Sequence, residues 1–194
     1  MRRTSASNLL LCTAMVACAS TSPSDLPPEQ FGAIVALVRG RPWISDPSSD
    51  SVVATYDPSS QRLIIGGSRT DRYGYHTGLA LDICAALEQR TYAFASTPNG
   101  PFGFDAMKLG VLGQWWEPAE TLPERVTGPY VSLAFSSRGG PDDELVIEQI
   151  DLLANQIRGS FRFQAFSPTG QVVASISGRF SGRLAQRSAR CSIP

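Results

Sequence analysis

The sequence predicts an all-β fold, mostly antiparallel, in which a single β-sandwich or barrel-like domain contains little helix. Apolar residues alternate with polar ones in short runs, as between Leu79 and Ile83. Turn-forming residues separate these runs, and no segment carries a capped apolar stripe with the 3.6-residue period of a helix. The last three runs pair into two hairpins whose core residues share one face, as a half-buried sheet requires.

Extended runs are expected at residues 31–37, 51–56, 61–66, 79–83, 90–95 and 130–136. In the first run, Phe31, Ala33, Val35 and Leu37 would share one face of the strand. The segment from Thr97 to Pro129 is rich in proline and is the least regular part of the chain. One short helix is expected there, near Ala106 to Leu112, and Gly110 and Gly113 argue against a long one.

The last hairpin is predicted by its turn, Ser167-Pro168-Thr169-Gly170, which suits a type I turn with Pro second and Gly fourth. A tight turn here places Phe161 opposite Ile176 on the core face. The same register places Arg158 opposite Arg179 on the other face, which is an unfavourable like-charge pair.

The preceding run supplies acids for that arginine row. A five-residue loop, Asp151 to Asn155, would place Glu148 opposite Arg158 and Glu144 opposite Arg162. The face is then a solvated, salt-bridged surface in which each exposed pair contributes less than about 1 kcal/mol. The alternative interpretation of the arginine row is a site for an anion or a lipid headgroup.

The amino terminus predicts an exported protein. Arg2 and Arg3 precede an apolar stretch from Leu9 to Ala17, which is much shorter than the roughly 20 residues that span a bilayer, so residues 1–17 are expected to be a signal peptide. Met15-Val16-Ala17-Cys18 resembles a lipobox and predicts a palmitate-type lipid on Cys18. Ala17-Cys18-Ala19 also fits an ordinary signal peptidase, which would leave a soluble periplasmic protein.

This organisation predicts four parts: the signal peptide, a lipidated Cys18 with a Ser/Pro-rich tether over residues 18–30, a domain over 31–184 and a tail over 185–194. The expected location is the cell envelope, where the lipid would anchor the domain to the outer membrane, facing the periplasm or the exterior.

Without residues 1–17 the chain keeps 15 basic and 17 acidic residues. That balance argues against nucleic acid, which requires a basic surplus. The expected partners are the membrane, through the anchor, and a glycan or an envelope protein.

No catalytic residue, cofactor or metal site is predicted. His76 is the only histidine, which excludes a site with several histidine ligands. On one straight strand it would lie about 26 Å from Cys84, too far for a dyad. The acids from Asp142 to Glu144 could ligate calcium, but their spacing matches no known loop and an acidic hairpin tip is the commoner outcome.

Cys84 and Cys191 are the two cysteines that remain if Cys18 is acylated. In an oxidising compartment such a pair predicts a disulfide, which would close a loop of roughly 100 residues and contribute up to about 4 to 5 kcal/mol.

Trp115 and Trp116 are candidates for recognition, since exposed tryptophans stack on sugars or contact partners. A core or lid position is the other interpretation of these two residues.

Two parts of the sequence resemble a known protein family. The strand Gly159-Ser160-Phe161-Arg162-Phe163, the following hairpin and Gly178-Arg179-Phe180 resemble the end of a family of uncharacterised bacterial β-rich lipoproteins. The start, from Phe31 to Trp43, is similar too, and the resemblance covers about residues 31–184. It implies a β-sandwich or barrel-like fold on a lipid anchor and names no catalytic residue.

The expected function is therefore a membrane-tethered, non-catalytic domain that acts in binding or in envelope structure. The alternative is a small extracytoplasmic hydrolase or carbohydrate-active enzyme, because paired carboxylates brought together by folding need no sequence motif.

Overall fold

The computed structural model describes residues 26–48, 50–72, 74, 76–94, 111–118, 132–167 and 169–187. Regular structure in these ranges is β-strand, which confirms the predicted all-β class. None of these residues forms a helix of the length and hydropathy needed to cross a membrane. The strands are β1 (Ala33–Val38), β2 (Arg41–Ile44), β3 (Val52–Asp57), β4 (Arg62–Thr70), β5 (His76–Cys84), β6 (Thr91–Ala93), β7 (Val111–Pro118), β8 (Ser132–Ser137), β9 (Glu144–Asp151), β10 (Gln156–Phe166) and β11 (Val172–Gln186).

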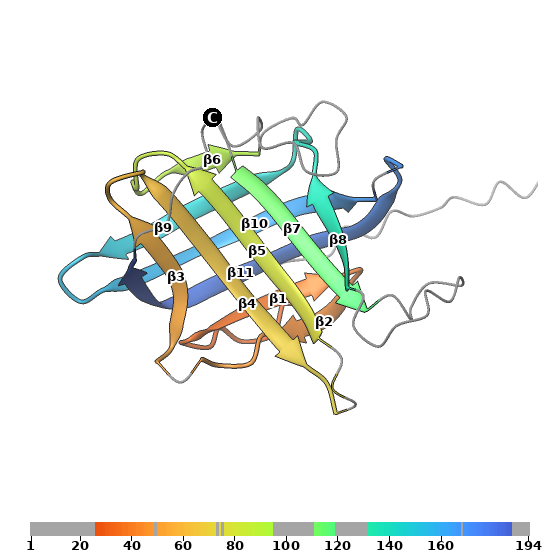
Figure 1. Ribbon diagram of the computed structural model, residues 1–194, viewed down its shortest axis with the longest axis horizontal. Helices are drawn as coiled ribbons and strands as arrows, with labels where there is room; N and C mark the ends of the chain where they lie inside the picture. The colour runs from red at the N-terminus through yellow and green to blue at the C-terminus, as the bar shows by residue number, and fades with distance from the viewer. Residues whose placement is uncertain are drawn as a thin grey trace, which may run out of the picture.

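The strands form two crossed layers that are joined by hydrogen bonds at their corners (Figure 1). One layer has the order β2-β1-β11-β10-β9-β6, and the other has the order β3-β4-β5-β7-β8. Strand β11 pairs with β3, and β10 pairs with β8, so a circuit of hydrogen-bonded strands returns to β11. Strand β3 lies parallel to β11, whereas the other strand pairs are antiparallel. The fold is therefore a sandwich whose layers close into a barrel-like circuit.

The hairpin of β10 and β11 has its core face as predicted but a different register. Phe161 lies opposite Gly178, and Gly159 lies opposite Phe180. The prediction that Phe161 faces Ile176 is wrong by two residues. A shift of two keeps every side chain on its own face, because the side-chain period of a strand is two.

A longer connection between the two strands causes this shift. The backbone N–H of Ser167 donates to the carbonyl of Gln171 at 2.9 Å, and a bulge interrupts the ladder near the end of β10. Arg158 consequently lies opposite Ser181. The predicted like-charge pair between Arg158 and Arg179 is therefore wrong, and the longer loop removes the repulsion.

The hairpin of β9 and β10 is closer to its prediction. Glu144 lies opposite Arg162, as expected. The turn takes the four residues 152–155 instead of five, which shifts the pairing next to the turn by one residue. Gln149, and not Glu148 as predicted, therefore lies opposite Arg158. A bulge between Arg158 and Gly159 restores the predicted register further along the hairpin.

Strand β1 is buried on both faces, which accounts for its nearly continuous apolar sequence. The core between the layers receives Ile34, Ala36 and Val38. The alternate residues Ala33, Val35 and Leu37 are buried on the outer side of the layer. These three residues share one face of the strand, as expected, whereas Phe31, which was expected with them, precedes the strand with 51% of its surface exposed.

Strand β7 lies within the segment that was expected to be irregular. Val111 and Leu112, assigned to a short helix from the sequence, are the first residues of this strand, and residues 106–110 lie outside the described ranges. Gly113, which was expected only to limit that helix, lies inside the strand, and a Cβ there would lie 2.7 Å from the ring of Phe94 and 3.0 Å from that of Phe163. The glycine therefore allows close packing inside a strand. Strand β11 also extends to Gln186, two residues beyond the expected end of the domain.

Candidate functional site

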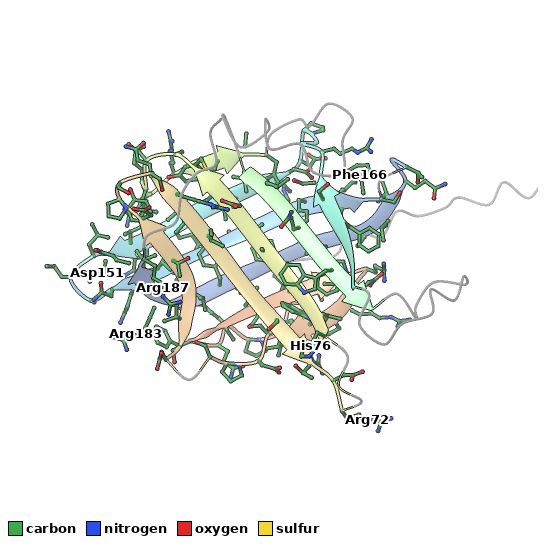
Figure 2. The ribbon with its side chains drawn as sticks, viewed as in Figure 1. Arg72, His76, Asp151, Phe166, Arg183 and Arg187 are labelled. Carbon is green, nitrogen blue, oxygen red and sulfur yellow. The ribbon has the colours of Figure 1, made fainter. Side chains whose placement is uncertain are left out.

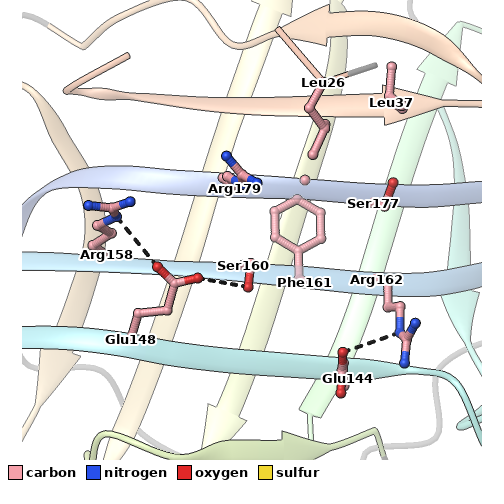
Figure 3. A pocket seen from close by; sticks show the side chains of 11 residues that line it. Leu26, Leu37, Glu144, Glu148, Arg158, Ser160, Phe161, Arg162, Ser177 and Arg179 are labelled. Atoms are coloured by element: carbon pink, nitrogen blue, oxygen red, sulfur yellow. Dashed lines mark hydrogen bonds and ion pairs between the residues drawn. The ribbon is translucent and has the colours of Figure 1, made fainter. Parts of the chain in front are cut away.

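A shallow groove of about 420 Å³ lies on the outer face of the layer that contains β1, β11, β10 and β9 (Figure 3). Its floor is formed by the outward residues of β10 and β11, because alternate positions on these strands point away from the core. One wall carries Leu26 and Leu37, and the opposite wall carries two glutamates. The lining residues are Leu26, Leu37, Glu144, Glu148, Arg158, Ser160, Phe161, Arg162, Ser177, Gly178 and Arg179.

Arg158 lies at one end of the groove and forms ion pairs with two glutamates. Its Nη2 lies 3.0 Å from the carboxylate of Glu29, which belongs to the chain segment before β1. Its Nε lies 3.4 Å from the carboxylate of Glu148 on β9. The hydroxyl of Ser160 donates to the same glutamate at 3.1 Å. Arg158 is therefore paired with two carboxylates, one of which connects the segment before β1 to β10.

Arg162 lies at the other end of the groove and forms one ion pair. Its Nε lies 3.3 Å from the carboxylate of Glu144, the residue directly opposite on β9. The two side chains are 54% and 40% exposed, so this pair contributes little to stability. Both side chains lie along the rim of the groove (Figure 3).

Arg179 lies between these two pairs and differs from them. It stands on β11 opposite Ser160 of β10 and Val35 of β1. Within the described ranges its side chain forms no ion pair and no hydrogen bond, although it is partly buried. The neighbouring hydroxyl of Ser177 is likewise without a hydrogen bond in that part of the chain. A guanidinium offers five N–H donors in a planar array that matches a carboxylate or a phosphate. The groove therefore presents one guanidinium that has no ion-pair partner among the described residues.

The two candidate tryptophans lie on opposite faces of β7. Trp115 is buried at 3% exposure and contacts Trp43 edge to face, with ring centroids 5.5 Å apart. It therefore occupies the core position that was the other interpretation, and its ring is not available for stacking. Trp116 is only partly buried and lies over Gly78, where a Cβ would be 2.0 Å from its ring.

A partly buried ion pair beside Trp115 was not anticipated from the sequence. Glu117 is buried at the end of β7, and it accepts two hydrogen bonds from Arg39, at 3.0 and 2.7 Å. The indole N–H of Trp115 also donates to this carboxylate, at 3.2 Å. Arg39 comes from the β1–β2 turn, 78 positions away in the sequence, so no local pattern signals the contact.

His76 begins β5 and is exposed, with its Nδ1 2.9 Å from the hydroxyl oxygen of Thr70. Asp143 is buried and accepts the backbone N–H groups of Gly140 and Gln164, at 2.8 and 3.1 Å. These bonds shape the turn before β9. Across the described residues, no group of three histidine, cysteine or acidic side chains is placed to hold a metal ion.

Cys84 ends β5 and lies opposite Arg62 of β4. Arg62 binds Asp82 through two hydrogen bonds, at 3.0 and 2.5 Å. These bonds raise the pKa of the Arg62 guanidinium above its usual value, against the opposing effect of burial. Cys191 lies outside the described residues, as does Cys18, so the disulfide and the lipidation stay predictions.

Comparison of the chain with protein-family models, with curated proteins and with solved structures gives no match.

Proposed function

We propose that this protein is a membrane-tethered, non-catalytic binding domain of the bacterial cell envelope, and that its groove holds an anionic group of an envelope glycan or protein. The observation that carries the proposal is Arg179, a partly buried arginine whose side chain has no counter-ion among the described residues. A carboxylate or a phosphate is the ligand group that fits it.

The surroundings of Arg179 favour a binding role over that of an ordinary surface arginine. Arg158 and Arg162 each form an ion pair with a glutamate, which favours one arrangement of the polar groups at both ends of the groove. A preformed arrangement reduces the ordering cost of binding. The hydroxyl of Ser177 adds a donor that is not used within the described chain, and Leu26 and Leu37 add an apolar wall for a sugar ring or an aliphatic chain.

The proposed lipid anchor would keep this groove close to a bilayer. Seven residues separate Cys18 from Leu26, which already lines the groove. A fully extended chain of that length spans at most about 28 Å. Intact-mass measurement of the protein extracted from bacterial membranes tests the anchor. We expect a chain that begins at Cys18 and carries acyl groups, whereas an unmodified chain that begins after Cys18 would contradict it.

The alternative function, a hydrolase with paired carboxylates, would place its chemistry on Glu144 and Glu148, which line the same groove. Each of these carboxylates is already held in an ion pair with an arginine. The unpaired group in the groove is a cation, so binding of an anion is the function that the geometry favours.

A binding screen tests the groove directly. The immobilised protein is exposed to acidic and neutral oligosaccharides and to acidic and neutral peptides, at two salt concentrations. We expect acidic compounds to be retained at low salt, and retention to fall with Arg179→Gln and not with Arg41→Gln, an exposed arginine outside the groove. Retention of neutral compounds alone, or equal retention by both variants, would contradict the proposal.

A further inference from the structure

Two adjacent leucines stand at the tip of the β9–β10 hairpin. Leu153 is 97% exposed and Leu152 is 57% exposed. Single exposed apolar residues are common on protein surfaces, but this pair is adjacent and belongs to the four-residue turn 152–155 at the end of the β9–β10 hairpin (Figure 1). An exposed leucine at nearly full accessibility gains nothing from the fold of its own chain.

The turn that carries these leucines is well defined. The Asp151 side chain accepts the backbone N–H groups of Leu153 and Ala154, at 2.9 and 2.8 Å. Asn155 has a left-handed conformation, with φ of 52°, and its carbonyl accepts the N–H of Leu184 at 2.8 Å. The leucines therefore project from a fixed support.

Two arginines lie just behind the tip. Arg183 and Arg187 line a depression of about 480 Å³ that Asn155 also lines. Figure 2 shows both arginines at the same end of the molecule as Asp151. Within the described ranges neither arginine forms an ion pair, and Asp50 is the one acid that lines the depression with them.

We propose that this hairpin tip inserts into a phospholipid surface, with Leu152 and Leu153 among the acyl chains and Arg183 and Arg187 at the level of the phosphates. Apolar residues at the extremity with cations behind them match the depth profile of a membrane interface. The inference rests on the tip alone and does not depend on the groove. If the proposed anchor is present, its short tether raises the effective concentration of the tip at the bilayer.

Depth-dependent fluorescence quenching tests the insertion. Leu153→Trp is made in the full chain with Cys18→Ser, and the protein is mixed with vesicles of phosphatidylcholine and phosphatidylglycerol whose acyl chains carry bromine. Val172→Trp is the matched control, because Val172 is 55% exposed and follows the turn at the opposite end of β10. The parent protein corrects for the three native tryptophans.

We expect bromine to quench the added tryptophan at position 153 at least about threefold more than the one at position 172. Leu152→Asp in the Leu153→Trp protein should reduce that quenching to the control level, because a buried carboxylate is costly in hydrocarbon. Arg183→Gln with Arg187→Gln should raise the lipid concentration at half-maximal quenching about threefold or more, whereas Arg41→Gln should leave it unchanged.

Equal quenching at positions 153 and 172 would overturn the proposal. So would self-association that Leu152→Asp and Leu153→Asp abolish while quenching stays at the control level, since the tip would then be a protein interface. Circular dichroism of each variant verifies that the β-structure is retained.

Discussion

Phe161 lies directly opposite Gly178 on the core face of the β10–β11 hairpin, and its ring occupies the place of the missing side chain. A Cβ at position 178 would lie 2.6 Å from Cζ of Phe161 and 2.6 Å from the carbonyl oxygen of Val35. The relationship is reciprocal, because Phe180 lies opposite Gly159 on the same face. Each Gly-x-Phe segment therefore supplies both a ring and a space for the ring of the other strand.

The first prediction follows from this contact. Gly178→Ala should lower the free energy of unfolding by about 2 to 3 kcal/mol, because the backbone of β1 cannot move away from the added methyl group. Chemical denaturation measures the change. Gly66→Ala is the control, since a Cβ there would have its nearest neighbour, the carbonyl oxygen of Leu79, at 3.4 Å. Equal losses in the two variants would show that the Phe161 contact is not what requires glycine.

The same contact shows what the sequence could and could not predict about the fold. Period-two alternation was enough to assign Phe161, Phe163 and Phe180 to the core, because faces survive a register shift of two. The register itself depended on the loop after β10 and on the Gly–Phe complementarity. Neither follows from alternation, so Phe161 was paired with Ile176 instead of Gly178.

The second prediction concerns the ion pair of Arg39 and Glu117. Arg39→Ala leaves the buried carboxylate with the indole of Trp115 as its remaining side-chain donor among the described residues, so the free energy of unfolding should fall by about 2 to 3 kcal/mol. Arg162→Ala removes an exposed pair and should cost less than about 1 kcal/mol. Thermal and denaturant unfolding of both variants measures the difference, and similar small losses would mean that Glu117 is solvated without Arg39.

The third prediction separates packing from recognition at Trp116. Gly78→Ala should displace the indole, because the added Cβ would lie 2.0 Å from two of its ring atoms. We expect a loss of stability of about 1 to 3 kcal/mol and a red shift of tryptophan emission. Unchanged stability and emission would indicate that the ring moves freely on the surface.

The fourth prediction is the disulfide between Cys84 and Cys191. Peptide mapping of the exported protein without reductant should yield one cross-linked peptide that contains both residues. Reduction should lower the unfolding free energy by up to about 4 to 5 kcal/mol, since the bridge would close a loop of roughly 100 residues. Recovery of both cysteines as free thiols would refute the bridge.

The candidate site was only partly predictable. The pairing of Glu144 with Arg162 followed from strand register, as did the outward direction of the arginines. The position of Arg179 did not, because the longer β10–β11 loop moves it from Arg158 to a place opposite Ser160. Glu29, which forms one of the two ion pairs of Arg158, comes from the segment before β1, and no periodic pattern links that segment to β10. The sequence therefore suggested a fully paired face where the structure leaves one cation without an acid.

The central claim, an anion bound at Arg179, is tested most directly by isothermal titration with the acidic compound that the screen retains best. Arg179→Gln should raise the dissociation constant at least about tenfold, since a hydrogen bond to a charged group contributes about 1.5 to 3 kcal/mol. Arg183→Gln, on the same strand and face but outside the groove, should change it by less than about twofold. Equal affinity of the Arg179→Gln variant and the parent protein would contradict the account.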